Sequence, residues 1–407
     1  MPRYPTLSGP AQALPSSIFE SLKLRLASFP GQVIPLHIGD THLPPPKKSR
    51  LGSLGFPAGP DPDLYRYSPP PGKQGLLEAL ARKLQVRNRL AVTPDDIQIT
   101  AGATHALSCA VRSVLDPGDQ ILLLAPYWPL IRGIALASGI RPVDVPFSHV
   151  LLRGAPPLAA PGEDAARPSI EELIERFITP QTAALYVCTP NNPDGKVLSA
   201  AELEQIARVA QRHDLWVLAD EVYEDYLYDG RVHVSIASLP GMAERTVTVY
   251  SFSKSYGQAG LRVGYVVGPP GAAAAMRKMS NHSVYCVPRA MQVAALLALE
   301  HGAEFLDQAH RAYREARELA HGRMADLCLL PEGATYLWLD LRRFLGAGEE
   351  DVMPLLERLA DAGVLLAPGA AFGHAFKGWA RLCFTSVSRP WLEEGLDRVR
   401  RVLADSV

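Results

Sequence analysis

Short apolar runs alternate with segments of helical periodicity from Ile97 onward, and this alternation constrains the fold more than any other feature of the sequence. IQIT precedes a helix expected over residues 103–115, and QILLLA precedes one expected over residues 130–138. TAALYVC precedes a helix that Ser199 opens, with Glu202 in the capping-box position, and LWVLAD, TVTVYS and RVGYVVG follow. Strands joined by crossover helices pair in parallel, so we predict a doubly wound, mostly parallel α/β sheet.

The last third of the chain has a different pattern. Long helical segments over residues 289–325 precede a short strand in TYLWLDL, a helix over residues 351–362 and a strand that begins RLCFTSV. Helices with a few interspersed strands are typical of an α+β unit. We therefore expect a large domain over residues 49–288, a small domain over residues 289–407, and an N-terminal segment, residues 1–48, that joins the small domain.

Charge and cysteine usage exclude several classes of protein. The 41 basic and 42 acidic residues give a net charge of −1, which does not favour nucleic acid or an anionic membrane as a partner. The N-terminus lacks the apolar stretch of a signal peptide and no later run is long enough to span a membrane, so we expect a cytoplasmic protein with a small-molecule substrate. Five scattered cysteines without C-x-x-C spacing predict neither disulfides nor a metal site.

Polar motifs follow the predicted strands, where a doubly wound sheet usually binds its ligand. The sequence contains no G-x-G-x-x-G, P-loop or H-E-x-x-H motif, which disfavours dinucleotides, P-loop nucleotide chemistry and zincin chemistry. The motifs that do occur at strand ends are ITAGATHAL, APYWP, TPNNPDG, ADEVY and YSFSKSYGQAGLRVGY.

In this order and spacing, the five motifs resemble those of the class I and II aminotransferases, which are fold-type I enzymes similar to aspartate aminotransferase. The resemblance extends from about Leu36 to Arg381. It implies pyridoxal 5′-phosphate (PLP) as the cofactor, transfer of an amino group between an L-amino acid and a 2-oxo acid, and a place in amino-acid metabolism and biosynthesis. Residues 49–288 would then be the PLP-binding domain.

The resemblance assigns the reacting residues. Lys254 in SFSK follows an apolar strand, where partial desolvation favours the neutral amine that forms a Schiff base with the cofactor and later moves the substrate α-proton. Asp220, which ends LWVLAD, would keep the pyridine nitrogen protonated. Tyr223 and Asn192 would hydrogen-bond the 3-oxygen of the cofactor. Glu221 points to the opposite face of the strand and is expected to be structural.

Phosphate binding calls for amides at a helix N-terminus together with a fixed cation. The expected phosphate ligands are Gly102, Ala103, Thr104, Ser251, Ser253 and Arg262. Trp128 in APYWP would stack on the cofactor ring. Tyr67 in YSPPPG would reach the phosphate of a neighbouring subunit, which implies a homodimer with shared active sites.

The substrate carboxylate suits the planar guanidinium of Arg381, expected at the start of its strand. Gly39 in LHIGD would let the N-terminal segment pass close to the substrate, and Asn192 and Trp128 would also contact it. No second cation can be assigned to a substrate side chain. The segment SNHSVYCVPR instead offers His282 and Tyr285, so a neutral or aromatic amino acid is favoured over aspartate or glutamate.

Three positions depart from the family pattern, namely His42, Asp194 and Gln258, and of these Gln258 could place an amide near the site. His105 is interpreted as a helix-surface residue. The same site residues would also serve a PLP-dependent lyase, cyclase or oxidase. A PLP-binding transcriptional regulator is disfavoured because only about 35 residues precede the fold, too few for a helix-turn-helix module.

Overall fold

The computed structural model describes residues 5–14, 22, 25–26, 29–54, 65–147, 168–346 and 348–406. Its main feature is a seven-stranded sheet with the order β2-β8-β7-β6-β5-β3-β4. The strands are β2 (Ile97–Thr100), β3 (Gln120–Leu124), β4 (Arg141–Val145), β5 (Thr182–Cys188), β6 (Trp216–Asp220), β7 (Thr246–Ser251) and β8 (Gly264–Val267). The five from β3 to β7 pair in parallel, while β8 runs antiparallel to both β7 and β2. The predicted α/β sheet is confirmed, although β4 was not foreseen.

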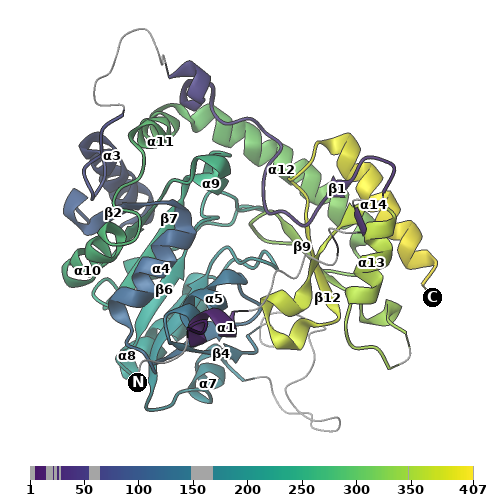
Figure 1. Cartoon of the computed structure of the whole chain (residues 1–407), viewed down its shortest axis with the longest axis horizontal. Helices are drawn as coiled ribbons and strands as arrows, with labels where there is room; N and C mark the ends of the chain where they lie inside the picture. The colour runs from purple at the N-terminus through teal and green to yellow at the C-terminus, as the bar shows by residue number, and fades with distance from the viewer. Residues whose placement is uncertain are drawn as a thin grey trace.

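Helices cover both faces of this sheet (Figure 1). One face packs against α4 (Gly102–Val114), α5 (Leu130–Ala137) and α10 (Pro270–Asn281), and the other against α7 (Ile170–Glu175) and α8 (Ala200–Arg212). Neighbouring strand residues belong to different cores, because side chains alternate across a strand. Leu122 and Leu185 pack toward α7 and α8, whereas Ile121 and Ala184 pack toward α4 and α5.

A second, smaller lobe lies beside the sheet edge (Figure 1). Its three-stranded antiparallel sheet has the order β11-β12-β9, formed by Ala367–Pro368, Trp379–Cys383 and Tyr336–Asp340. The helices α12 (Ala303–Met324), α13 (Met353–Asp361) and α14 (Arg389–Ala404) flank it. The helix α11 (Arg289–His301) packs against α3 (Gln74–Lys83) of the large lobe and leads into α12, whereas the N-terminal segment joins the small lobe, where β1 (Ile34–Pro35) pairs in parallel with β10 (Val364–Leu365).

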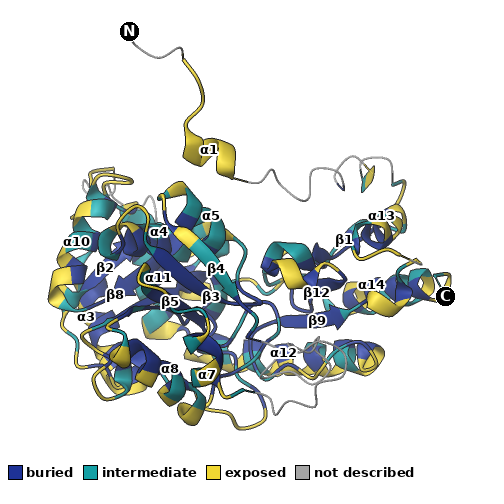
Figure 2. Ribbon diagram, turned by 90° about the horizontal axis from the view of Figure 1, so that it is seen from below, coloured by how far each residue is buried: buried dark blue, intermediate teal, exposed yellow. Residues whose placement is uncertain are grey.

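The remaining elements are short. They are α1 (Gly9–Ala13), η1 (Lys47–Ser49), η2 (Leu51–Ser53), the π-helical η3 (Leu84–Asn88), η4 (Pro94–Asp96), η5 (Ile236–Ser238), α9 (Phe252–Ser255), η6 (Ala259–Leu261), η7 (Arg342–Phe344), η8 (Gly369–Phe372) and η9 (His374–Phe376). Figure 2 shows burial concentrated in the two sheets, whereas α1, which contacts α5, has no buried residues. No helix among the described residues is long and apolar enough to cross a membrane.

The parallel strands bring their carboxyl ends to one edge of the large sheet, which faces the small lobe (Figure 1). A ligand of a doubly wound sheet binds at this edge. Side chains that follow β3, β5, β6 and β7 therefore meet residues of β9 and β12 across the boundary between the lobes.

Candidate active site

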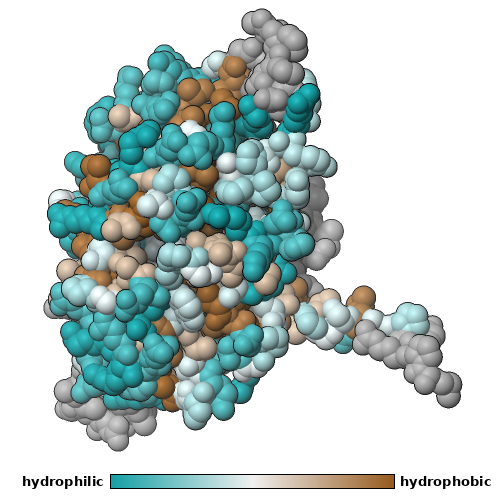
Figure 3. Space-filling view, turned by 90° about the vertical axis from the view of Figure 1, so that its left-hand side faces the viewer, coloured by the Kyte–Doolittle hydropathy of each residue, from teal (hydrophilic) through white to brown (hydrophobic). Residues whose placement is uncertain are grey.

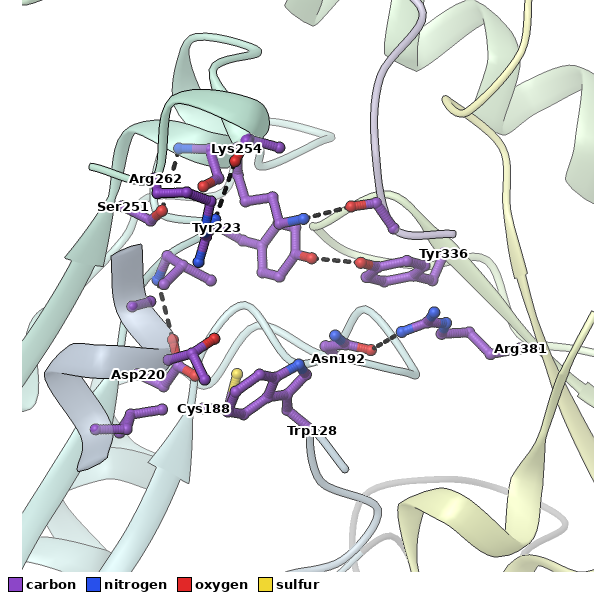
Figure 4. Close-up of a pocket in the computed structure, with 17 residues that line it drawn as sticks. Trp128, Cys188, Asn192, Asp220, Tyr223, Ser251, Lys254, Arg262, Tyr336 and Arg381 are labelled. Atoms are coloured by element: carbon purple, nitrogen blue, oxygen red, sulfur yellow. Dashed lines mark hydrogen bonds between the residues drawn. The ribbon is translucent and has the colours of Figure 1, made fainter. Parts of the chain in front are cut away.

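A cavity of about 210 Å³ lies at this boundary and is lined by residues of both lobes (Figure 4). Twelve of the residues predicted from sequence line it, namely Gly39, Ala103, Thr104, Trp128, Asn192, Asp220, Tyr223, Ser251, Ser253, Lys254, Arg262 and Arg381. Gly102 lies directly beside the cavity, against Arg262. Tyr67 does not line it. The lining residues that sequence reasoning missed are Leu107, Cys188, Val222, Ala259 and Tyr336.

Lys254 lies on α9, the single helical turn that follows β7. Ser251 caps this turn by accepting a hydrogen bond of 3.1 Å from the amide of Ser253. The Lys254 ammonium donates a hydrogen bond to the carbonyl oxygen of Gly39 and lies 5.8 Å from the centre of the Tyr223 ring (Figure 4). This hydrogen-bond partner is a neutral carbonyl group, and Lys254 forms no ion pair among the described residues.

Asp220 is the last residue of β6 and is only 3% exposed. One carboxylate oxygen accepts a hydrogen bond of 2.7 Å from the Tyr186 hydroxyl, and the other accepts one of 3.4 Å from the amide of Val222. Desolvation nevertheless raises the pKa of Asp220 to about 6, against the effect of these hydrogen bonds. Within the described part of the chain Asp220 has no ion-pair partner, so the position suits a cationic group of a ligand.

The N-terminus of α4 and Arg262 form the opposite end of the cavity. Gly102 begins α4 with φ +78°, and a Cβ atom there would lie 2.3 Å from Nη2 of Arg262. The guanidinium donates hydrogen bonds of 3.0 and 3.4 Å to the carbonyl oxygens of Ala259 and Ala101. Only glycine leaves room for the arginine at the helix N-terminus, where helix amides and a fixed cation together suit a phosphate group. The cavity also receives the hydroxyls of Thr104, Ser251 and Ser253.

The small lobe contributes Arg381, which is 8% exposed. Its Nη1 donates a hydrogen bond of 2.8 Å to Oδ1 of Asn192, and its Nη2 donates one of 2.7 Å to the carbonyl oxygen of His37 (Figure 4). The Nε is buried without a hydrogen-bond partner among the described residues. The expected position at the start of a strand is wrong: Arg381 is the third residue of β12, paired with Trp338 of β9.

Tyr336 is the site residue that sequence reasoning missed most clearly. It opens β9, and its hydroxyl shares a hydrogen bond with the hydroxyl of Tyr223 (Figure 4). The sequence signal that could have identified Tyr336 is the alternation of side chains along the strand YLWLD. Tyr336 and Trp338 belong to the core cluster that includes Tyr223 and Phe372, whereas Leu337 and Leu339 belong to the cluster on the other face, as the period-two alternation of a strand requires.

The positions that depart from the family pattern mostly have structural contacts. Asp194 is half-buried in the turn after β5, where it accepts hydrogen bonds from Nδ2 of Asn191 at 2.9 Å and from the amide of Lys196 at 3.0 Å. His42 contacts the carbonyl oxygen of Thr385 at 3.1 Å. Gln258 is 2% exposed and does not line the cavity, although its side-chain amide has no hydrogen-bond partner among the described residues.

His105, interpreted as a helix-surface residue, is half-buried in the first turn of α4 and does not line the cavity. Its Nδ1 accepts a hydrogen bond of 3.1 Å from the amide of Ala101, and its Nε2 lies 2.8 Å from the Ser283 hydroxyl, so the side chain anchors the start of α4. Glu221 has the structural contacts expected of it. It is fully buried on the far side of β6, where it accepts a hydrogen bond of 2.8 Å from Tyr250 and contacts His233 at 3.0 Å.

Comparisons with known proteins agree with this geometry. Residues 32–399 match the family model of the class I and II aminotransferases. The aspartate/prephenate aminotransferase of Thermus thermophilus is 36% identical over 349 residues, which cover 83% of this chain and 83% of that protein. Aromatic-amino-acid aminotransferase 2 of Thermococcus litoralis is 33% identical over 351 residues, covering 85% and 86%. A solved double mutant of the Thermus thermophilus aspartate aminotransferase superimposes with a TM-score of 0.84 at 31% identity, covering 98% of this chain and 100% of that one.

A match over nine-tenths of the sequence, with the same fold, defines the class of protein: the chain belongs to the class I and II aminotransferase family. It is an aminotransferase, an enzyme that moves an amino group between an amino acid and a 2-oxo acid. The family implies PLP as the cofactor. The function and fold predicted from the sequence are thereby confirmed.

Proposed function

We propose that the cavity binds PLP and that Lys254 is the residue that bonds to it. The observation that carries this proposal is the position of Asp220: a buried carboxylate without an ion-pair partner among the described residues shares one cavity with Lys254, and with Arg262 at the N-terminus of α4. Bound PLP supplies a reactive aldehyde carbon and an electron-withdrawing ring. The chain supplies groups that suit both the ring end and the phosphate end of PLP.

Each residue then has a defined task. Nζ of Lys254 would hold the cofactor through its aldehyde carbon, and the same amine would serve as the base for the proton at the substrate Cα. Asp220 holds a proton on the ring nitrogen, and this cation in turn favours the ionised carboxylate. Tyr223 and Asn192 donate hydrogen bonds to the 3-oxygen. Trp128 covers one face of the ring and contacts the substrate.

The phosphate is held by the amides at Gly102 and Ala103, by the Thr104, Ser251 and Ser253 hydroxyls, and by Arg262. Arg381 would bind the substrate carboxylate with two N–H groups and so orient the substrate in the cavity. Gly39 leaves space for the substrate beside this arginine. The hydrogen bond from Arg381 to Asn192 supports this arrangement, since it links the carboxylate end of the cavity to the ring end.

Borohydride reduction of the purified holoenzyme, followed by peptide mapping, tests the cofactor assignment. We expect a phosphopyridoxyl group on Lys254 alone. Peptides that contain other lysines serve as the internal control, because they should stay unlabelled. One of these is Lys196, which is paired with Glu202 and Glu332. A label on another lysine, or no label, would reject the assignment.

We propose that the preferred amino donor is neutral or aromatic. The cations among the described residues that line the cavity are Lys254, Arg262 and Arg381, and each already has a task, so none remains for a second substrate carboxylate. Related proteins carry names for aromatic, aspartate and arginine substrates, so similarity alone does not select the donor. A panel of amino acids added to the holoenzyme, followed by the loss of the yellow absorption band, tests this. The fastest response to aspartate or glutamate would contradict it.

We also propose a homodimer in which Tyr67 completes the partner's site. Tyr67 is 81% exposed, lies outside the cavity of its own chain, and packs edge-on against Tyr285 at 4.9 Å between ring centres. Both tyrosines line an apolar groove of about 940 Å³ that also includes Leu51, Tyr65 and Met291. Figure 3 shows one side of the large lobe, where apolar patches interrupt the hydrophilic surface. Exposed aromatic groups that serve a neighbouring site would explain this groove.

Mixed dimers test the sharing of sites. A Tyr67→Ala chain and a Lys254→Ala chain should each be nearly inactive alone, and mixing them with subunit exchange should restore activity, because one site then receives an intact lysine and an intact partner tyrosine. No restoration, or a monomer in sedimentation, would contradict the proposal.

We further propose the division into residues 49–288 and 289–407 with residues 1–48 joining the small domain, which the pairing of β1 with β10 supports.

A further inference from the structure

We propose that Tyr336 is a positioning residue that connects the cofactor end of the site to the carboxylate end. The inference rests on the proposed PLP site and extends it to a residue of the small lobe. Tyr336 contacts three groups that otherwise belong to separate parts of the site: the hydroxyl of Tyr223, the guanidinium of Arg381, and the backbone at Gly39.

The first contact is the shared hydrogen bond between the hydroxyls of Tyr223 and Tyr336. The two rings meet edge to face, with centres 5.7 Å apart and planes at 78°, so the geometry of the pair is fixed by packing as well as by the hydrogen bond. Both side chains are at most 2% exposed. A hydroxyl buried in this way needs a partner, and each tyrosine provides it for the other.

The second contact is with Arg381. Its Cζ lies 4.3 Å from the centre of the Tyr336 ring and 5.0 Å from the centre of the Phe372 ring. Aromatic faces attract a guanidinium, more strongly where water is excluded, and they hold its plane parallel to the rings. The Nη1 and Nη2 hydrogen bonds fix the same group from its edge. The Tyr336 ring therefore helps to set the plane in which Arg381 meets a carboxylate.

The third contact explains a glycine. A Cβ atom on Gly39 would lie 2.0 Å from the Tyr336 hydroxyl and 3.0 Å from its Cζ, so any larger residue would displace the phenol. The carbonyl oxygen of the same Gly39 accepts the hydrogen bond of Lys254. Gly39 thus allows Tyr336 to approach Tyr223 while the backbone at this position holds the lysine.

The direction of the shared hydrogen bond decides what Tyr336 does chemically. If Tyr223 donates its proton to the 3-oxygen of the cofactor, its own oxygen accepts the proton of Tyr336. A hydroxyl that accepts a hydrogen bond becomes a stronger donor, because neighbouring hydrogen bonds polarise one another. Tyr336 therefore strengthens the interaction of Tyr223 with the 3-oxygen without touching the cofactor.

The test is a pH titration of the absorption of holoenzyme carrying Tyr336→Phe. This variant keeps the ring beneath Arg381 and removes only the hydroxyl. When the hydrogen bond from Tyr223 to the 3-oxygen is weaker, the cofactor holds its nearby proton more tightly. The pH at the midpoint of the absorption change should therefore rise by roughly half a unit. Tyr223→Phe, which removes the donor itself, should raise it further. The KM for the amino donor should stay within about twofold, since the ring remains.

Two further variants sharpen the result. Tyr336→Leu also removes the aromatic face, so it should raise KM as well as the midpoint. Gly39→Ala should impair the enzyme less in the Tyr336→Phe background than alone, because the clashing hydroxyl is then absent. An unchanged midpoint in Tyr336→Phe, or additive effects of Gly39→Ala and Tyr336→Phe, would overturn the proposal. Borohydride labelling of Lys254 in the unsubstituted enzyme separates this outcome from failure of the PLP site itself.

Discussion

The two walls of the active site are built in different ways. On the large-lobe wall, the reacting groups follow strand ends directly: Asp220 ends β6, and Lys254 lies three residues after β7. On the small-lobe wall, Arg381 lies in the middle of β12, Tyr336 opens β9, and Gly39 lies in the segment after β1. The first wall depends on local chain geometry, and the second depends on contacts between distant segments. In the proposed function, the groups that bond to the cofactor lie on the first wall, and Arg381, which would orient the substrate carboxylate, lies on the second.

The largest expected effect belongs to the first wall. Lys254→Ala removes both the bonding amine and the base at the substrate Cα, so steady-state turnover should fall by at least about 10⁴-fold. PLP should still bind, because Gly102 and Arg262 do not depend on the lysine. Lys278→Ala on α10 is the matched control and should be active. Turnover in Lys254→Ala close to that of the control would remove the lysine from the mechanism.

Asp220→Asn comes next in size. The amide keeps the shape of the carboxylate but cannot hold a charged ring nitrogen, so we expect a loss of roughly 10²- to 10⁴-fold in kcat with smaller changes in cofactor binding. Asp194→Asn, a substitution of another aspartate whose pKa is raised by desolvation but which lies outside the cavity, is the control. Near-normal turnover in Asp220→Asn would contradict the role at the ring nitrogen.

The same two aspartates make the apoenzyme less stable as the pH rises. Burial raises the pKa of Asp220 from 3.8 to about 6, and that of Asp194 likewise from 3.8 to about 6. The folded-state pKa of each aspartate exceeds its unfolded value, so the protonated carboxyl group stabilises the folded state. This contribution is complete below about pH 4 and is lost as the pH rises through 6. Each loss amounts to about 3 kcal/mol in the free energy of unfolding.

Urea unfolding of the apoenzyme between pH 4 and pH 7 measures these contributions. Asp220→Asn and Asp194→Asn should each remove the part of the pH-dependent change in unfolding free energy that the substituted aspartate causes. Adding PLP should remove only the part caused by Asp220, because the cationic ring nitrogen compensates that carboxylate alone. Equal effects of PLP on both parts would show that Asp220 does not face the cofactor.

Arg381→Lys gives the smallest of the four effects and probes the second wall. A lysine cannot make the paired hydrogen bonds of a guanidinium or lie flat against Tyr336. We expect a loss of about 1.5–3 kcal/mol in transition-state stabilisation, so kcat/KM should fall by roughly 10- to 150-fold. Absorption of the resting holoenzyme should change little, since the large-lobe wall is intact. Steady-state kinetics with a good amino donor checks this, and an unchanged kcat/KM would exclude the role.

The accuracy of the sequence predictions follows the same division. The strands around Asp220 and Lys254 could be found because buried parallel strands are continuous apolar runs and the residues after them are punctuated by recognisable motifs. The position of Arg381 in its strand was predicted wrongly, because β12 begins at Trp379 and its start is set by pairing with β9. The contact of His105 with Ser283 could not be predicted, because it joins α4 to a segment 178 residues away.

By itself, the sequence determined the doubly wound sheet, the family, and the groups placed at the ends of β5, β6 and β7, since these follow from hydrophobic periodicity and from residues adjacent in the chain. Only the tertiary structure decided that Tyr336 meets Tyr223, a contact between residues 113 positions apart. It also decided that Gly39 must lack a side chain for that contact to form. The physical reason is that packing between lobes depends on where whole elements lie, and this information is absent from any local pattern.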